Sequence, residues 1–312
     1  MADDNLLLHV AGKQNVADGV VLFTLASLDA AGELPGWTPG AHIDVHLAAG
    51  LVRQYSLIGD VSDRARYRFA VRRIGKGRVS SRLHDVVGVG DAITVSAPRN
   101  SFPLVEDRRP LAFVAGGIGI TPFLPMIQRA AAEGRDWTLH YGGRDVSAMP
   151  FVSELADHGD RVSIHPENQY GPLPLEAIVA DASRRDARVY CCGPSGMIDE
   201  VSRLVKDPSL LSVERFRPPA ETVGGTIEVD LATSGIRLSV PADETILEAV
   251  ERVGVFALSS CRTGVCGTCE TRVLDGVPDH RDTFLSSAER QAGASILICV
   301  SRSRTPRLTL DL

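Results

Sequence analysis

The chain reads Cys261-Arg262-Thr263-Gly264-Val265-Cys266-Gly267-Thr268-Cys269 in its last third. A fourth cysteine, Cys299, follows within the apolar run Ile296-Leu297-Ile298-Cys299-Val300, which predicts a strand. Three thiolates that converge on one small group need a tightly curled backbone, and Gly264 and Gly267 permit the dihedral angles of such a curl. The cysteines therefore predict one metal centre, held by a loop and by a distant strand.

The spacing of these cysteines is C-x4-C-x2-C followed by a remote cysteine, which is the ligand pattern of plant-type ferredoxins. It predicts a 2Fe-2S cluster with Cys261, Cys266, Cys269 and Cys299 as ligands. Zinc is the alternative, because Cys266-x2-Cys269 alone would suit that ion. Zinc sites usually pair two such short motifs and the second is missing, so iron and sulfide are preferred.

The sequence before the cysteine loop predicts the rest of a β-grasp ferredoxin domain. Residues 226–231 and 236–240 alternate apolar and polar side chains around a turn, which predicts a hairpin. A helix is expected next, with Asp243 as its N-cap and Gly254 just past its end. We expect this domain to cover residues 223–312.

Two other styles of sequence come earlier. Residues 6–101 hold short β-type runs between Gly/Pro turns, which predicts a small β-barrel or sandwich, with domain bounds of 1–104. From Leu111 to Phe216 strand and helix patterns alternate, which predicts a parallel α/β sheet in a domain of residues 105–222. The Pro-rich run from Arg217 to Gly225 is typical of a linker.

A glycine-rich loop in the α/β region predicts a nucleotide site. In Ala115-Gly116-Gly117-Ile118-Gly119-Ile120-Thr121-Pro122, the glycines let N–H groups approach a pyrophosphate. Thr121 is expected to cap the following helix and Pro122 to begin it. A second loop, Cys191-Cys192-Gly193-Pro194-Ser195-Gly196-Met197, also joins a strand to a helix.

Both loops should meet at the carboxyl ends of their strands, where open α/β sheets bind ligands. Cys192 is expected to pack beside the nicotinamide, although a vicinal disulfide with Cys191 stays open. An ordinary strand-to-helix turn is the alternative for the first loop.

The β-rich region holds a candidate flavin segment, Arg53-Gln54-Tyr55-Ser56-Leu57. An arginine can grip a phosphate, a tyrosine can pack on an aromatic ring, and a serine hydroxyl can bond a flavin nitrogen. Ala70-Val71-Arg72 and Gly77-Arg78-Val79-Ser80-Ser81 can supply further groups around the same cofactor. Taken alone, each piece also fits an ordinary strand or turn.

Together these pieces resemble the phthalate dioxygenase reductase family over essentially the whole chain, and vanillate O-demethylase reductases equally. Further matching pieces are Pro98-Arg99-Asn100-Ser101-Phe102-Pro103-Leu104 and the run Tyr190 to Pro194. In that family an FMN barrel, an NAD domain and a ferredoxin follow one another, and this chain has the same order. The segment Ile74 to Ser81 departs from the family by being shorter and differently composed.

The resemblance implies that Ser56 and Thr121 lie at the flavin and nicotinamide, which makes them the candidate catalytic residues. Phe216 matches a family aromatic near the isoalloxazine. The expected FMN contacts are Arg53, Gln54, Tyr55, Ser56, Ala70, Val71, Arg72, Gly77, Ser80, Ser81 and Phe216. The expected nucleotide contacts are Gly116, Gly117, Gly119, Thr121, Pro122, Arg144, Asp145, Cys192, Gly193 and Pro194.

NADH is preferred over NADPH, because Asp145 would repel a 2′-phosphate, although Arg144 could bind one. The resemblance implies an NADH-dependent reductase that moves electrons from NADH to FMN, then to the 2Fe-2S cluster, then to a terminal Rieske oxygenase of aromatic catabolism. A hydride carries two electrons and a cluster accepts one, and the flavin converts between them.

Three other functions stay open: a reductase for a haem monooxygenase, a non-enzymatic iron–sulfur carrier, and a zinc-stabilised interaction protein. The composition bears on two further classes, nucleic-acid-binding proteins and membrane proteins. The 312 residues carry a net charge of -6, which gives no sign of nucleic-acid binding. No apolar run is long enough for a membrane span, and the polar N-terminus favours a cytoplasmic protein.

Overall fold

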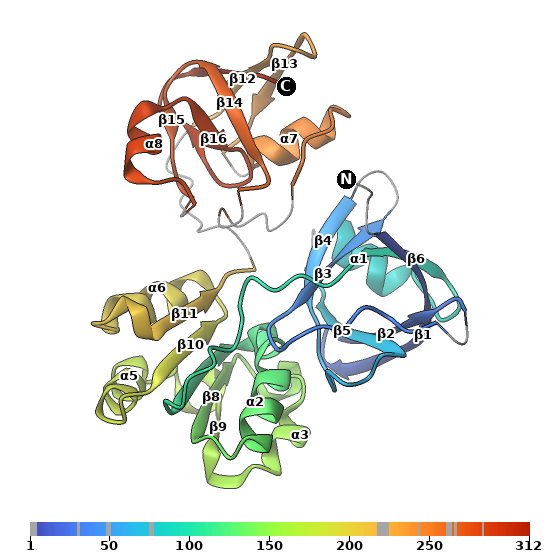
Figure 1. Ribbon diagram of the computed structural model, residues 1–312, viewed down its shortest axis with the longest axis vertical. Coiled ribbons are helices and arrows are strands. Elements are labelled where there is room, and N and C mark those ends of the chain that lie inside the picture. The colour runs from blue at the N-terminus through green and yellow to red at the C-terminus, as the bar shows by residue number, and fades with distance from the viewer. Residues whose placement is uncertain are drawn as a thin grey trace. The chain divides into compact units, whose positions relative to one another are not determined.

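The computed structural model describes residues 5–29, 32–47, 51–74, 78–216, 225–242, 244–259, 264, 267–282 and 284–312. The chain forms two compact units, Met1–Glu214 and Arg215–Leu312 (Figure 1). The first unit contains both regions that the sequence assigns to a flavin and a nucleotide domain. The finer boundaries near residues 104 and 222 stay predictions, and most of the predicted linker lies outside the described residues.

The first part of this unit is a six-stranded antiparallel sheet in the order β4-β3-β6-β1-β2-β5. Side chains on its inner face, among them Phe23, Ile43 and Phe69, form a buried core with Leu83 of helix α1. The strands are β1 (Asn5–Ala17), β2 (Val20–Ser27), β3 (His42–Leu47), β4 (Leu51–Ser56), β5 (Arg66–Arg72) and β6 (Ala92–Ser96), and α1 spans Arg78–Asp85.

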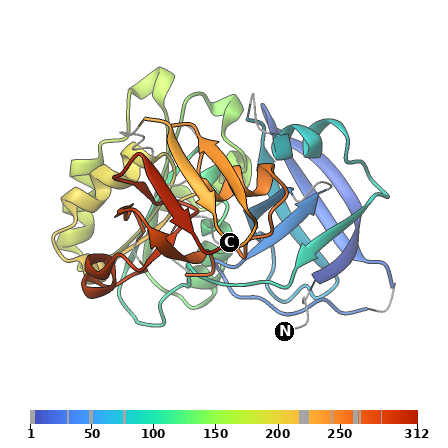
Figure 2. The same ribbon diagram turned by 90° about the horizontal axis from the view of Figure 1, so that it is seen from above.

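The sheet is strongly curled (Figure 2), and its edge strands β4 and β5 lie in contact. Between these edges the described residues pair only through one bridge, from Ile58 to Arg68. The structure therefore confirms a strongly curled, barrel-like sheet in this region, although the described residues do not close it into a complete barrel.

The second part is a parallel sheet in the order β11-β10-β7-β8-β9, as the sequence predicts. Apolar side chains alternate along β7, so that Phe113 packs on one face with Phe123 while Val114 packs on the other with Ile198. The strands are β7 (Leu111–Gly116), β8 (Trp137–Gly143), β9 (Val162–Pro166), β10 (Arg188–Cys192) and β11 (Leu211–Glu214). The helices are α2 (Phe123–Ala132), α3 (Val152–Ala156), α4 (Glu167–Tyr170), α5 (Leu175–Arg184) and α6 (Ser195–Leu204), with short 3-10 turns η2 (Gly117–Ile120), η3 (Val146–Ala148), η4 (Gly159–Arg161) and η5 (Pro208–Leu210).

A buried arginine holds the connection between the two sheets. Arg135 donates to the Val105 and Arg109 carbonyls at 2.9 and 2.7 Å, and it pairs with Asp107 at 2.6 Å. One apolar core also spans both sheets, because Leu22 and Ala70 of the first sheet belong to the same buried cluster as Phe113 of the second. The two sheets therefore form a single body.

The second unit has the strand order β13-β12-β18-β14-β16, in which the first and last strands of the unit pair in parallel. This arrangement agrees with the predicted β-grasp. Its elements are β12 (Ile227–Leu231), β13 (Ile236–Val240), α7 (Ile246–Arg252), β14 (Glu270–Asp275), β15 (Pro278–Asp279), α8 (Ser287–Ala292), β16 (Ser295–Leu297), β17 (Arg302–Ser303) and β18 (Arg307–Leu310).

Two local predictions for this unit were wrong. Helix α7 is capped by Thr245, whose side chain accepts from the Glu248 N–H in a capping box, and not by Asp243, which lies outside the described residues. The strand predicted over 296–300 ends at Leu297, because the Val300 and Ser301 N–H groups turn back to the Leu297 carbonyl. Cys299 thus sits in a turn.

Candidate functional site

The two glycine loops of the first unit lie at one point of the parallel sheet. From β7 the chain proceeds outward to β8 and β9, and then returns to β10 on the other side of β7. Such a reversal of strand order opens a crevice at the carboxyl ends of the strands. The loops that follow β7 and β10 both end there, because Ala115 pairs with Cys192 across the two strands.

The backbones of these loops approach so closely that only glycine fits. A Cβ on Gly119 would lie 2.2 Å from the Cys192 carbonyl oxygen, and one on Gly193 would lie 2.9 Å from the Gly116 Cα. Gly117 adopts a positive φ of 56°. The glycines therefore serve the contact between the loops as well as the expected approach of a pyrophosphate.

Thr121 and Pro122 differ from their predicted roles in the helix. Helix α2 begins at Phe123 with Pro122 as its N-cap, so the prediction that Thr121 caps it was wrong. Thr121 instead ends the 3-10 turn η2, and its hydroxyl donates to the Ile118 carbonyl at 3.0 Å. The extra 3-10 turn moves the helix start by one residue, and Thr121 stays buried beside the glycine loop.

The flavin segment lies on β4 and its partner segment on β5, which are the two converging edges of the curled sheet. Tyr55 packs on Phe69 with ring centroids 5.1 Å apart, and burial raises the pKa of its hydroxyl despite the opposing charge of Arg53. Arg53 donates to the Val52 carbonyl and Gln54 contacts His42, at 2.8 and 3.3 Å.

The residues of β5 and α1 divide into two groups. Ala70 and Val71 are buried in the two cores, so their backbone alone can serve a ligand. Arg72 is exposed and reaches the glycine loop, with Nη1 3.7 Å from where a Gly117 Cβ would lie. Arg72 thus lies beside the glycine loop, and its expected contact with the FMN stays a prediction. Ser80 is buried and accepts from the Ile74 N–H, Ser81 is half-buried, and Gly77 lies outside the described residues.

A half-buried carboxyl group that the sequence reasoning missed joins the flavin segment to the nucleotide loops. Glu214 ends β11, and its Oε2 lies 3.9 Å from the Cys192 Sγ. Burial raises the pKa of Glu214 to about 8, against smaller opposing effects of Cys192 and Ser56. The Ser56 hydroxyl is buried without a hydrogen bond of normal geometry, although its dipole still favours the Glu214 carboxylate.

These three side chains come from three different strand ends. Burial, reinforced by Glu214, also raises the pKa of the Cys192 thiol well above its usual value, so this thiol is not a nucleophile. Cys191 packs on the opposite face of the sheet from Cys192, which argues against a vicinal disulfide. The sequence signal that could have identified Glu214 is an acidic residue at the end of the last parallel strand.

A second set of polar groups lies where β8 and β9 end. Asp145 accepts from the Ser147 N–H at 2.8 Å and from the Asn168 side chain, and these bonds lower its pKa. The Asn168 N–H donates to the Arg144 carbonyl at 3.0 Å. Glu167 is exposed beside them. The sequence reasoning identified Arg144 and Asp145 but missed Glu167 and Asn168, which follow the next strand.

In the second unit, the structure brings Cys269 and Cys299 together. Both are buried, and the Ile298 N–H donates to the Cys269 carbonyl at 3.4 Å. Gly264 and Gly267 have φ values of 78° and 76°, the left-handed conformation that the curled loop was predicted to need. Two buried cysteines whose backbones are joined by this hydrogen bond fit part of an iron–sulfur ligand set. Cys261 and Cys266 lie outside the described residues.

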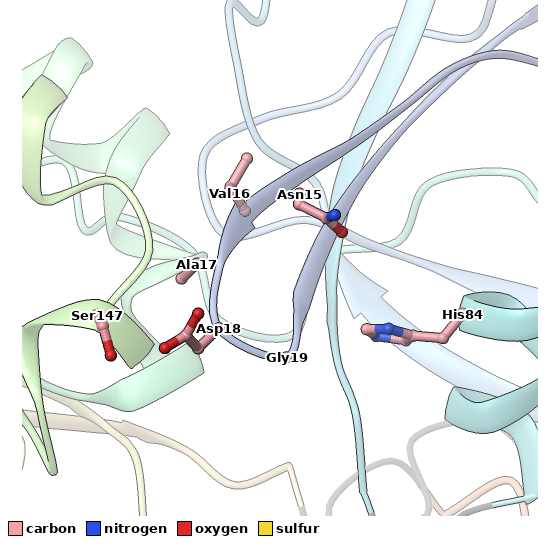
Figure 3. Close-up of a pocket in the computed structure, with 7 residues that line it drawn as sticks. All are labelled: Asn15, Val16, Ala17, Asp18, Gly19, His84 and Ser147. Atoms are coloured by element: carbon pink, nitrogen blue, oxygen red, sulfur yellow. The ribbon is translucent and has the colours of Figure 1, made fainter.

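Two further features belong to neither centre. Phe216 is half-exposed just beyond the first unit, and its expected contact with the flavin stays a prediction. A cavity of about 500 Å³ lies between the β1–β2 turn, His84 of α1 and Ser147 of η3, and none of the predicted site residues lines it (Figure 3). None of the helices in the described ranges is long and apolar enough to cross a membrane.

Comparison with known proteins agrees with this division. Residues 7–103 match the oxidoreductase FAD-binding domain, and residues 229–304 match the 2Fe-2S iron-sulfur cluster binding domain. The chain is 45% identical to phenoxybenzoate dioxygenase subunit beta of Ectopseudomonas oleovorans, over 100% of this chain and 98% of that one.

Solved structures match as well. The chain superposes on phthalate dioxygenase reductase, described as a modular structure for electron transfer from pyridine nucleotides to [2Fe-2S], with a TM-score of 0.81 and 35% identity over 99% of this chain and 98% of that one. It also matches an intact type IV self-sufficient cytochrome P450 monooxygenase with a TM-score of 0.72 and 38% identity, over 99% of this chain but 41% of that one.

The fold and these matches define a flavin- and iron–sulfur-containing oxidoreductase that takes electrons from a pyridine nucleotide. Its domain order runs from flavin to nucleotide to ferredoxin along one chain. The chain belongs to the phthalate dioxygenase reductase family, and the resemblance seen in the sequence is confirmed.

Proposed function

We propose that this protein is the NADH-dependent reductase component of an aromatic-ring dioxygenase or O-demethylase system. The observation that carries the proposal is the meeting of Ser56, Cys192 and Glu214 at the strand reversal, in a chain that also brings Cys269 and Cys299 together. The relative from Ectopseudomonas oleovorans is named as a dioxygenase subunit, which supports an oxygenase as the electron acceptor.

The residues of the first unit would hold a flavin and a nicotinamide nucleotide side by side. When bound, a flavin takes up a hydride and releases single electrons, which is chemistry that the side chains cannot supply. Ser56 offers an unpaired buried hydroxyl toward that ring, and Arg53 a cation for the phosphate. Thr121 and Cys192 would lie beside the nicotinamide, and the closely packed loops around Gly119 would hold its pyrophosphate.

Glu214 keeps a proton in this site at neutral pH, because burial raises its pKa to about 8. A protonated carboxyl can donate a hydrogen bond without placing a negative charge beside the nicotinamide. No side chain needs to act as a nucleophile. Ser56, Thr121 and Glu214 therefore orient the reactants and exclude water.

FMN is proposed over FAD, by analogy with phthalate dioxygenase reductase. NADH is proposed over NADPH because Asp145 and Glu167 place two carboxylates at the ends of β8 and β9, where a 2′-phosphate would be repelled. Cys261, Cys266, Cys269 and Cys299 are proposed as the cluster ligands. A cytoplasmic location is proposed with them.

The test is the purified holoprotein with NADH or NADPH and cytochrome c as acceptor. We expect bound FMN, two iron and two sulfide per chain, and reduction of cytochrome c that prefers NADH. Protein that carries a cluster but no flavin and does not oxidise NADH would instead be an electron carrier. Zinc without iron or sulfide would select the interaction protein.

One observation favours a second acceptor. A cytochrome P450 monooxygenase holds a module that is 38% identical to 99% of this chain, so the same fold can serve haem iron. Turnover with candidate acceptors distinguishes the two functions. We expect NADH-driven product formation with a Rieske-type oxygenase, and faster turnover with a P450 would contradict that part of the proposal.

A further inference from the structure

A buried carboxylate lies beside the cysteine loop of the second unit, and the function above does not use it. The Asp282 side chain is completely buried, at 0% exposure. Gly264, which lies between Cys261 and Cys266 in the sequence, packs directly on it. A Cβ on Gly264 would lie 3.0 Å from the Asp282 Cα and 2.7 Å from the Val300 side chain. Asp282 and Val300 therefore pack against Gly264, the described residue between the first two cysteines.

The hydrogen bonds of Asp282 reach the other cysteine-bearing segment. Its Oδ1 accepts from the Ser301 hydroxyl at 3.3 Å, and Ser301 is two residues beyond Cys299. Its Oδ2 accepts from the Leu285 N–H at 2.9 Å and lies 3.6 Å from the Arg290 Nη2. One carboxylate thus ties the support of the cysteine loop to the turn that carries Cys299.

Among the described residues, the negative charge of Asp282 is only partly compensated. Arg290 is 38% exposed, so water screens its charge. The buried His280 ring covers the carboxylate at 3.7 Å from Nδ1 to Oδ1, beyond hydrogen-bonding distance, and neither ring nitrogen has a partner. The carboxylate therefore keeps a net negative field inside the unit, where the dielectric constant is lower than in water.

We propose that Asp282 is a positioning residue of the iron–sulfur centre that also lowers its reduction potential. Adding an electron to a cluster adds negative charge, which a buried carboxylate nearby opposes. The hydrogen bonds to Leu285 and Ser301 keep that carboxylate between the two cysteine-bearing segments. The inference rests on the proposed assignment of the four cysteines as ligands. Its consequence is a cluster that gives its electron more readily to the partner.

The test is a potentiometric titration of the full-length holoprotein, followed by the paramagnetic signal of the reduced cluster. Asp282→Asn keeps the size of the side chain and removes its charge. We expect the equilibrium for cluster reduction to shift about tenfold toward the reduced form, which is 59 mV for one electron. Asp279→Asn is the matched control, because Asp279 is 29% exposed and pairs with Arg281 and Arg304. It should shift the equilibrium less than about threefold.

Arg290→Gln gives an independent test of sign, on a half-exposed side chain whose loss should not prevent folding. Removing this cation should move the cluster potential downward, opposite to Asp282→Asn. An Asp282→Asn protein with a normal cluster spectrum and the wild-type potential would overturn the proposal, as would an upward shift in Arg290→Gln. If Asp282→Asn does not assemble a cluster, the direction of the potential shift in Arg290→Gln decides whether the proposal holds. Wild-type protein without iron and sulfide would instead refute the ligand assignment.

Discussion

The two redox centres of this chain are built in opposite ways. In the first unit, Ser56, Cys192 and Glu214 come from the ends of β4, β10 and β11, so the site exists only when both sheets have formed. In the second unit, the expected ligands come from one loop and one turn, supported by a buried carboxylate. The first centre thus depends on the order of strands and the second on local backbone conformation. Substitutions should therefore have different consequences in the two units.

The largest effect is expected from Cys269→Ser. Loss of one thiolate removes a ligand from the cluster, so iron and sulfide should be lost while flavin reduction by NADH persists. Metal analysis measures the loss of the cluster, and stopped-flow absorbance at the flavin band measures flavin reduction separately. Cys191→Ala is the control, since Cys191 is buried in the other unit. Loss of flavin reduction together with the cluster would show that the two centres are not independent.

Gly119→Ala should damage the first centre instead. A Cβ would meet the Cys192 carbonyl oxygen at 2.2 Å, and neither backbone can move without the strand that carries it. We expect NADH-driven flavin reduction to fall about 100-fold, because small displacements of bound reactants are costly. Gly196→Ala, where a Cβ meets nothing within 4 Å, should leave the rate unchanged. Equal rates for both variants would contradict the close contact of the loops.

Glu214 makes the stability of the first unit depend on pH. Its pKa is raised from 4.5 to about 8 on folding, so the folded state holds the proton more tightly. The stabilisation is complete below about pH 4.5 and is lost as the pH rises through 8. In the wild type the free energy of unfolding should therefore fall between pH 6 and 9, and Glu214→Gln should reduce this fall by roughly 2 kcal/mol. The figure allows for the partial exposure of Glu214 to water. Urea unfolding at each pH measures the free energy, and an equal fall with pH in the wild type and the variant would refute this prediction.

A smaller effect is expected at the start of α7. Thr245→Ala removes the side chain that accepts from the Glu248 N–H at 3.1 Å. This should lower the free energy of unfolding of the second unit by about 1 kcal/mol. Ser234→Ala, at an exposed turn of the same unit, is the control. The thermal unfolding midpoint of the second unit should fall only in the first variant, with the first unit unaffected.

The same contrast explains what the sequence could predict. Gly264, Gly267 and the cysteines around them form a local pattern whose spacing is itself the signal, and the structure bears out both positive φ values. The glycine loop after β7 was likewise predictable, because strand, glycines and helix follow one another directly.

Contacts between distant strand ends were not predictable in this way. Glu214 meets Cys192 only because β11 pairs with β10, and Asn168 meets Asp145 only because β9 pairs with β8. The predictions of the two helix N-caps were wrong for a local reason. At α2 a 3-10 turn used Thr121, and at α7 Thr245 with Glu248 offered a complete capping box two residues beyond Asp243.

The central claim is that one chain takes electrons from NADH in its first unit and stores them singly in its second. An anaerobic titration of the purified holoprotein with NADH tests it most directly, with absorbance and paramagnetic resonance recorded together. We predict bleaching of the flavin band and the appearance of a reduced 2Fe-2S signal. A flavin that is bleached while the cluster remains fully oxidised, or no response of either, would contradict the account.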